Sequence, residues 1–189
     1  MAGVLLAAGQ GARLGTPKAL VELGGIRLVD RGIAVLAEGG ADPVVVVTGA
    51  APLELPGVIT VANPDWRTGM GSSLAVGLQA VPADCAGAVI ALVDQPLIGA
   101  GSVRRLIDAW QAGATVAVAA YGGQQRNPVL ISREHWPGVI ALAAGDVGAR
   151  PFLRARPDLV TAVECGDIGS PEDIDTREDL ARLAESLSR

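Results

Sequence analysis

Arg13 and Lys18 are two positively charged side chains in a short glycine-rich segment that directly follows an apolar run. Residues 5–20 read LLAAGQGARLGTPKAL, and neither cation has an acidic side chain near it in the sequence. The glycines permit positive φ angles, so that consecutive backbone N–H groups can converge on an anion. Their spacing matches neither the Walker A loop nor the dinucleotide-binding fingerprint. We therefore expect an anion site of a different kind, suited to a triphosphate. The alternative is a tight turn that binds no ligand.

Asp94 directly follows the apolar run GAVIALV, which should form a buried strand. A carboxylate at the end of a strand suits a hard cation such as Mg²⁺, and a turn cap is the simpler alternative. One carboxylate rarely suffices for a metal, so we expect a second oxygen ligand. Residues 170–180, SPEDIDTREDL, offer candidates, among them Asp175 directly before the predicted helix cap Thr176. Spacing alone does not select Asp175.

Two hydroxyl groups, those of Ser72 and Ser73, follow the glycine-rich stretch GMG at residues 69–71. The apolar residues beyond them recur at helical spacing, so either serine is predicted to be the N-cap of a helix. A helix N-terminus attracts phosphate or carboxylate oxygens. Ordinary capping without a ligand explains the same pattern.

These residues require a scaffold in which several apolar strands end close together. Apolar runs at 3–8, 43–49, 57–64, 87–94, 114–121, 127–132 and 159–166 are predicted strands. Amphipathic or capped stretches at 27–40, 72–81, 102–113, 133–145 (broken at Pro137), 148–156 and 176–189 are predicted helices. Such alternation predicts an α/β fold with a mostly parallel sheet, and the 189 residues suit a single domain, 1–189. In this class of fold, ligands bind beyond the carboxyl ends of the strands.

Composition excludes several classes of function. Half of the residues are apolar but only 3% are aromatic, which suits parallel strands covered on both faces. The net charge of −5 argues against a nucleic-acid partner. No uncharged apolar stretch reaches the ~18–20 residues of a membrane span, and no basic region precedes the N-terminal apolar run. The two cysteines form no CxxC motif, so we expect a reduced, cytoplasmic protein without a membrane partner.

Six segments resemble, in order, the motifs of the MobA-like nucleotidyltransferases, and among these the molybdenum cofactor cytidylyltransferases. They are LLAAGQGARLGTPKAL, NPDWRTGMGSSLAVGL, LVDQPL, NPVLISREHW, GDVGAR and DIDTREDL. The resemblance extends from Val4 to about Leu180. It implies a three-layer α/β/α Rossmann-like nucleotidyltransferase fold. It also implies Mg²⁺-dependent transfer of CMP from CTP to the terminal phosphate of molybdopterin, with release of pyrophosphate.

The resemblance also implies roles for individual residues. Arg13, Lys18 and Asp94 would act in catalysis, and Asp94 and Asp175 would hold Mg²⁺. The nucleotide would lie against Leu6, Ala7, Ala8, Gly9, Gly11, Arg13, Lys18, Gly71, Ser72 and Ser73. The molybdopterin-type acceptor would lie against Asn127, Gly145, Asp146, Gly148 and Arg150. Ala8 stands where guanylyltransferases of the family carry glycine, and its methyl group would narrow the base pocket in favour of a pyrimidine.

The chain departs from the family pattern at Gly11, where serine is frequent, and at Asn127, where the cytidylyltransferases carry histidine. The second change puts the acceptor in doubt more than the nucleotide. Two other functions stay open: an NAD(P)H-dependent oxidoreductase of the same fold family acting on an N-heterocycle, and a non-catalytic carrier of molybdenum cofactor that serves a client molybdoenzyme. Retention of Lys18, Asp94 and Asp175 favours transfer, because hydride transfer needs no Mg²⁺ site.

Overall fold

Runs of small and branched apolar residues form the central sheet, because such side chains pack well on a pleated surface. The computed structural model describes residues 1–187. Seven strands lie in the order β5-β4-β1-β6-β8-β7-β9. Their bounds are Ala2–Leu6 (β1), Val44–Thr48 (β4), Ile59–Ala62 (β5), Gly87–Leu92 (β6), Val116–Tyr121 (β7), Gln124–Ser132 (β8) and Val160–Glu164 (β9).

The sheet is mostly parallel, as predicted. Strand β1 pairs in parallel with β4 on one side and β6 on the other, and the pairs β4–β5 and β7–β9 are also parallel. Strand β8 is the exception, because it runs antiparallel to both β6 and β7. The first residues of β8 therefore lie at the sheet edge where the other strands end.

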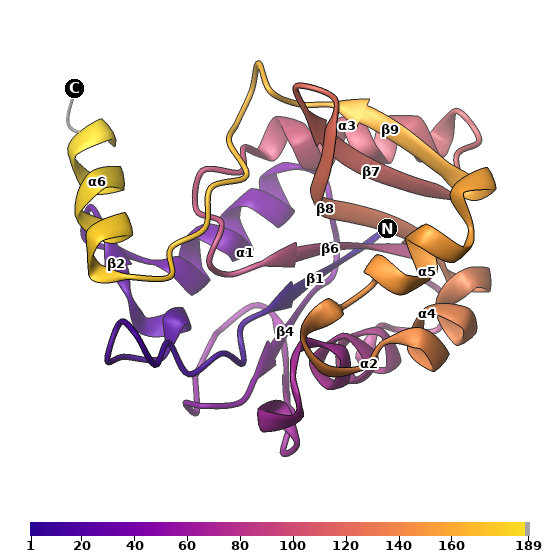
Figure 1. The fold of residues 1–189 in the computed structure, drawn as a ribbon. Coiled ribbons are helices and arrows are strands. Elements are labelled where there is room, and N and C mark those ends of the chain that lie inside the picture. Colours follow the sequence, from indigo (N-terminus) through magenta and orange to yellow (C-terminus); the bar gives the residue numbers. More distant parts are fainter. Residues whose placement is uncertain (188–189) are drawn as a thin grey trace.

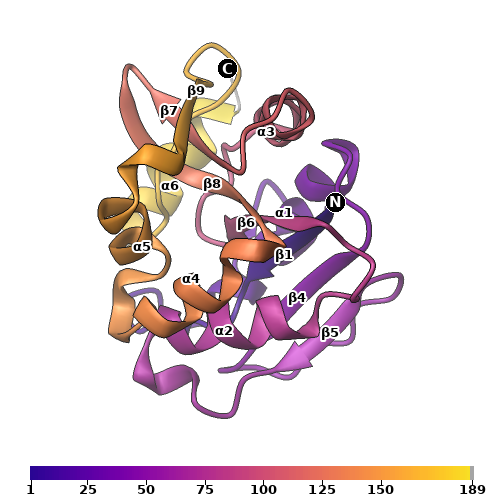
Figure 2. The ribbon, with the colours of Figure 1, turned by 90° about the vertical axis from the view of Figure 1, so that its right-hand side faces the viewer.

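Helices cover both faces of the sheet and complete three layers (Figures 1 and 2). The bounds are Leu28–Glu38 (α1), Met70–Ala80 (α2), Ala100–Gln111 (α3), Trp136–Leu142 (α4), Arg150–Ala155 (α5) and Arg177–Leu187 (α6). Helices α1 and α3 pack on one face, and α2, α4 and α5 pack on the other. Alternate residues of β1 point to opposite faces of the sheet. Leu5 belongs to the core beneath α1 and α3, whereas Val4 and Leu6 belong to the core beneath α2, α4 and α5. This arrangement confirms the predicted α/β/α architecture.

Helix boundaries confirm one predicted cap and correct two details. Thr176 caps α6 as predicted, since its Oγ1 accepts a hydrogen bond from the backbone N–H of Asp179 at 3.1 Å. The prediction for α2 was wrong: this helix begins at Met70, so both serines lie inside its first turn. Pro137 lies in the first turn of α4 and does not break the helix, because proline is well tolerated at that position. Positions 188 and 189 of the predicted last helix lie outside the described residues.

Sequence analysis missed a small hairpin, β2 (Glu22–Leu23) with β3 (Ile26–Arg27), whose turn contains two glycines at positive φ. Helix α6 lies beside this hairpin in Figure 1. Leu183 of α6 is 2% exposed and belongs to the same apolar cluster as Leu14 and Leu23. The C-terminal helix is thus held against the hairpin near the N-terminus. Within residues 1–187, no helix has the length and apolar character needed to cross a membrane.

Candidate functional site

The glycine-rich loop leaves β1 and turns back on itself at Lys18, whose backbone N–H donates to the carbonyl of Gly9 at 3.2 Å. Gly11 and Gly15 adopt positive φ angles of 62° and 75°, whereas Gly9 does not. A Cβ at Gly11 would lie 2.1 Å from the carbonyl oxygen of Thr16, so the serine frequent in the family does not fit this conformation. Among the described residues, the N–H groups of 9–13 donate no hydrogen bond to protein. These donors support the predicted anion site.

Three of the predicted nucleotide-lining residues lie at the start of this loop. Leu6, Ala7 and Ala8 are all buried. The carbonyl of Ala8 accepts a hydrogen bond from Ala50 N–H at 3.1 Å. A Cβ added at Gly49 would lie 2.8 Å from the Ala8 methyl group, so the two segments approach closely at this point.

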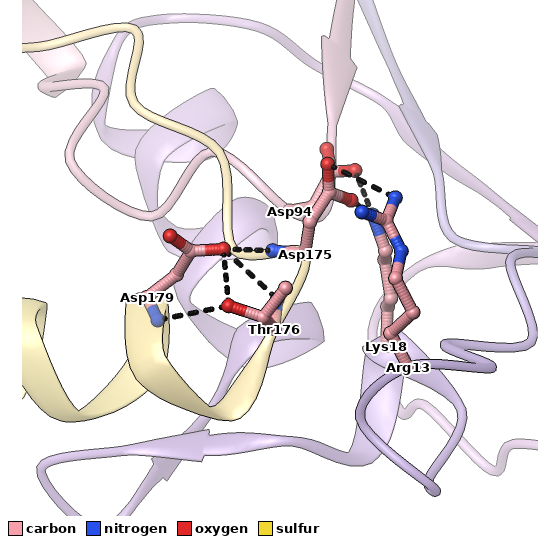
Figure 3. A network of polar contacts seen from close by, with 6 residues as sticks. All are labelled: Arg13, Lys18, Asp94, Asp175, Thr176 and Asp179. Atoms are coloured by element: carbon pink, nitrogen blue, oxygen red, sulfur yellow. Dashed lines mark hydrogen bonds and ion pairs between the residues drawn. The ribbon is translucent and has the colours of Figure 1, made fainter.

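Lys18 lies between two carboxylates (Figure 3). Its Nζ is 2.6 Å from Asp94 Oδ2 and 2.6 Å from Asp175 Oδ1. Arg13 Nη2 lies 3.6 Å from the other oxygen of Asp175. Arg13 and Lys18 therefore have acidic partners, although no acidic side chain stands near either cation in the sequence. Both partners are distant in the sequence, which is why the local pattern did not reveal them.

Sheet topology explains this convergence. Leu6 and Leu92 are paired neighbours at the ends of β1 and β6, so the loop after β1 and Asp94 emerge side by side. The segment between β9 and α6 then crosses the same edge, and Ile174 N–H donates to the carbonyl of Asp94 at 2.8 Å. That bond sets Asp175 next to Asp94.

The electrostatics of the group depend on this pairing. Burial alone would lower the pKa of Lys18, but the charges and hydrogen bonds of Asp94 and Asp175 outweigh it and raise the pKa above its usual range. Partial desolvation raises the pKa of Asp173, and the two neighbouring carboxylates raise it further. Sequence analysis missed Asp173, although it stands two positions before Asp175 in the same acidic segment. The carboxylates of Asp94 and Asp175 therefore stabilise the charged form of Lys18.

The residues present fit a divalent cation. Asp94 Oδ1 is buried without a hydrogen-bond partner among the described residues, so one carboxylate oxygen remains available. Two carboxylates already converge on one cation, the Lys18 ammonium. Within residues 1–187, no group of three or more His, Cys, Asp or Glu side chains has metal-binding geometry. A metal here would therefore complete its coordination with oxygens from a ligand such as a phosphate.

The serines of the GMGSS segment already have partners within the protein. Asn63 Nδ2 donates to Ser72 Oγ at 2.9 Å and to Ser73 Oγ at 3.0 Å, and Ser73 is buried. Gly71 has a packing role, because a Cβ there would lie 2.8 Å from the backbone of Ala143 and Ala144. The first turn of α2 thus packs closely against residues 143–144, which directly precede the predicted acceptor residues.

A pocket of about 470 Å³ lies at the same edge of the sheet. It is lined by four of the five predicted acceptor residues, Asn127, Asp146, Gly148 and Arg150, while Gly145 does not line it. Sequence analysis missed Arg126 and Arg154, which also line the pocket. The wall includes apolar side chains of the strands, such as Leu92 and Val129. The pocket therefore suits a ligand that is anionic on one side and apolar on the other.

Residues 3–160 match the family described as the MobA-like NTP transferase domain. The chain belongs to this family. Among its relatives, the nicotine blue oxidoreductase of Paenarthrobacter nicotinovorans is 38% identical over 96% of this chain and 95% of its own length. The purine catabolism protein PucB of Bacillus subtilis is 31% identical over 98% of this chain and 97% of its own length. The family implies a nucleoside triphosphate as the substrate class.

Solved structures confirm the Rossmann-like nucleotidyltransferase fold, among them a nucleotidyl transferase from Methanothermobacter thermautotroptrophicus with a TM-score of 0.81 at 22% identity, covering 100% of this chain and 97% of its own. The structure of a homologue of Mycobacterium tuberculosis Rv0371c, from Mycobacterium sp. strain JC1, has a TM-score of 0.85 at 34% identity, covering 100% of this chain and 96% of its own. Mycobacterium tuberculosis Rv0371c has also been solved in complex with manganese, with a TM-score of 0.79 at 29% identity, covering 98% of each chain. A divalent metal is thus known in a structure of similar fold.

Proposed function

We propose that the protein is a metal-dependent nucleotidyltransferase that moves CMP from CTP to the terminal phosphate of a molybdopterin-type acceptor. The observation that carries this proposal is the meeting of Lys18, Asp94 and Asp175 beside the glycine-rich loop. This arrangement places cations that could bind phosphates next to carboxylates that could bind a metal. Nucleotidyl transfer requires both kinds of group.

The loop would hold the triphosphate. Backbone N–H groups of residues 9–13 and the side chains of Arg13 and Lys18 would neutralise the phosphates. Lys18 would leave its two carboxylate partners to do so, and Asp94 and Asp175 would then hold Mg²⁺. The metal, when bound, would offset charge on the phosphates.

The transfer itself needs little chemistry from the protein. An oxygen of the acceptor phosphate attacks the α-phosphorus of CTP, and a new phosphoanhydride bond forms. The bond from the α-phosphorus to its bridging oxygen breaks, and pyrophosphate leaves with that electron pair. Because the attacking oxygen is already negatively charged, no strong general base is required. Positioning and charge neutralisation would supply most of the rate enhancement.

The pocket beside α5 would hold the acceptor. Its arginines, Arg126, Arg150 and Arg154, would bind an acceptor's phosphate, and the apolar strand residues would contact a flat ring system. Gly69 and Gly71 would keep this pocket close to the nucleotide, because both glycines permit close packing of α2 against residues 143–146.

The 38% identity to nicotine blue oxidoreductase favours a second candidate, hydride transfer from NAD(P)H to an N-heterocycle. This reaction would use the same pocket but would not require Asp94 and Asp175 as metal ligands. The two candidates therefore differ in whether a divalent metal is needed.

Calorimetric titration of CTP, GTP, ATP and NADPH, with Mg²⁺ and again with EDTA, separates the candidates. We expect Mg²⁺-dependent binding of CTP and pyrophosphate release when a molybdopterin-type acceptor is added. Both should be lost in Lys18→Ala and Asp94→Asn, with release falling by about 10²-fold or more. Asp158→Asn is the matched control, because it removes a carboxylate that forms an exposed ion pair with Arg156. Binding of NADPH without metal, together with no response to CTP, would support the oxidoreductase instead.

A further inference from the structure

Asp175 lies in the segment between β9 and α6, with its side chain 40% exposed. A carboxylate on such a segment can serve a fixed site only if its backbone is held in place. On its N-terminal side, Ile174 N–H donates to the carbonyl of Asp94 at 2.8 Å. The peptide unit that joins Ile174 to Asp175 is held by the N–H of Asp175, which donates to Asp179 Oδ2 at 3.1 Å. The peptide unit that follows Asp175 is held by the N–H of Thr176, which donates to the same oxygen at 2.9 Å. Both neighbouring peptide units are therefore anchored.

Asp179 does more than a helix cap requires (Figure 3). Its Oδ2 accepts the N–H of Asp175, and also the N–H and Oγ1–H of Thr176, both at 2.9 Å. Thr176 Oγ1 in turn accepts the N–H of Asp179 at 3.1 Å. A capping box involves only the cap residue and the third helical residue. Here the hydrogen bonds of the box also include Asp175, the residue before the cap, whose side chain bonds Lys18.

We infer that Thr176 and Asp179 are positioning residues for the carboxylate of Asp175. This assignment rests on the proposed function, because it gives Asp175 a role in metal and nucleotide binding. The Asp179 carboxylate fixes the position of the Asp175 backbone by accepting its N–H. Thr176 orients that carboxylate through the hydrogen bonds of its hydroxyl group. Helix α6, whose Leu183 is buried in the apolar core, supplies the rigid support. The cap of the last helix thus acts on the site through Asp175.

The test measures Mn²⁺ affinity in the presence of CTP by electron paramagnetic resonance, alongside the midpoint of thermal unfolding. Loss of an outer-shell partner typically weakens metal binding 10–100-fold, so Asp179→Ala should weaken Mn²⁺ binding about tenfold or more. Thr176→Val should weaken it less, and Thr176→Ser should restore it. Asp179→Asn keeps an acceptor oxygen and should fall between Asp179→Ala and the unsubstituted protein.

Glu178→Gln is the matched control. It removes one negative charge from the same helical turn, and Glu178 is exposed without a hydrogen bond from its side chain within residues 1–187. Its Mn²⁺ affinity should equal that of the unsubstituted protein. Because Thr176 and Asp179 belong to one network, the double variant Thr176→Val with Asp179→Ala should bind Mn²⁺ no more weakly than Asp179→Ala alone.

Three outcomes would count against the positioning role of Thr176 and Asp179. If Asp179→Ala lowers the unfolding midpoint but leaves the Mn²⁺ affinity unchanged, the cap only stabilises α6 and the inference is overturned. The same holds if Glu178→Gln weakens binding as much as Asp179→Ala does. If the unsubstituted protein binds no Mn²⁺ with CTP, the proposed function fails, and this assignment fails with it. Since the first two results require binding by the unsubstituted protein, the two failures are distinguishable.

Discussion

Lys18 Nζ lies 2.6 Å from Asp94 Oδ2, although 76 positions separate the two residues in the sequence. Asp175 contacts the same nitrogen from the other end of the chain. The ammonium of Lys18 thus lies between the two carboxylates that would hold the proposed metal. Two cations repel one another at short distances, so a metal bound by these carboxylates would compete with the ammonium. A triphosphate, which attracts both, would remove the competition.

Lys18→Met should therefore strengthen Mn²⁺ binding to the nucleotide-free protein. The gain should be about tenfold, the equivalent of one charge-assisted hydrogen bond that the metal no longer has to displace. The same variant should bind CTP more weakly, because a phosphate contact is lost. Arg13→Met should give a smaller gain, since Arg13 is 70% exposed and lies 3.6 Å from Asp175. Unchanged or weaker Mn²⁺ binding by Lys18→Met would contradict the competition.

Gly11→Ala should destabilise the protein and weaken CTP binding. The φ of 62° disfavours any side chain, and a Cβ would lie 2.1 Å from the carbonyl oxygen of Thr16. Gly25→Ala is the control, because its φ is 76° but nothing lies within 4 Å of the added Cβ. The control should lose about 1 kcal/mol of stability from φ alone, and Gly11→Ala should lose clearly more. Denaturant unfolding and calorimetry measure the two effects, and equal losses would show that the contact with Thr16 is unimportant.

Ala8→Gly should shift nucleotide preference toward purines. The buried methyl group approaches the Gly49 backbone, and its removal would widen the proposed base pocket. Because one methyl group in a binding pocket changes discrimination by about tenfold or more, the ratio of GTP to CTP affinity should rise by about that factor. Ala119→Gly removes another buried methyl group from β7, outside the predicted nucleotide-lining set, and should leave the ratio unchanged. A constant ratio in Ala8→Gly would mean that another residue selects the base.

Ionisation of the Tyr121 hydroxyl group should lower the stability of the protein at high pH. Burial raises the pKa of Tyr121 to about 12, above its value of 10.0 in an unfolded chain. Because the folded pKa is raised, stability is fully present below pH 10.0 and declines as pH rises toward 12. Tyr121→Phe should remove this part of the decline.

Tyrosinate absorbance measures this pKa directly, because Tyr121 is the only tyrosine in the sequence. Titration of the folded protein should give a midpoint about two units above that of the chain in denaturant. Coincident midpoints would contradict the burial of the hydroxyl group. Circular dichroism at each pH provides the control that the protein is still folded.

The sequence predicted much of the fold, because hydrophobic periodicity is a local property. Strands such as β4, whose residues are Val44–Thr48, read as apolar runs wherever they lie in a sheet. The direction of β8 was not readable in this way, since a buried strand looks the same whether its neighbours are parallel or antiparallel. The start of α2 was placed too late, because Gly69 and Gly71 serve packing against residues 143–146, which no local pattern records.

The same division applies to the site. The sequence by itself determined the ingredients: a glycine-rich turn with Arg13 and Lys18, a carboxylate at the end of a strand, and a helix cap at Thr176. Each depends on residues within a few positions of one another. Only the tertiary structure decided that Asp94 and Asp175 meet at Lys18 and that Asp179 reaches back to Asp175. These contacts follow from strand order and from the path of the chain after β9, which side-chain types in a linear sequence do not record.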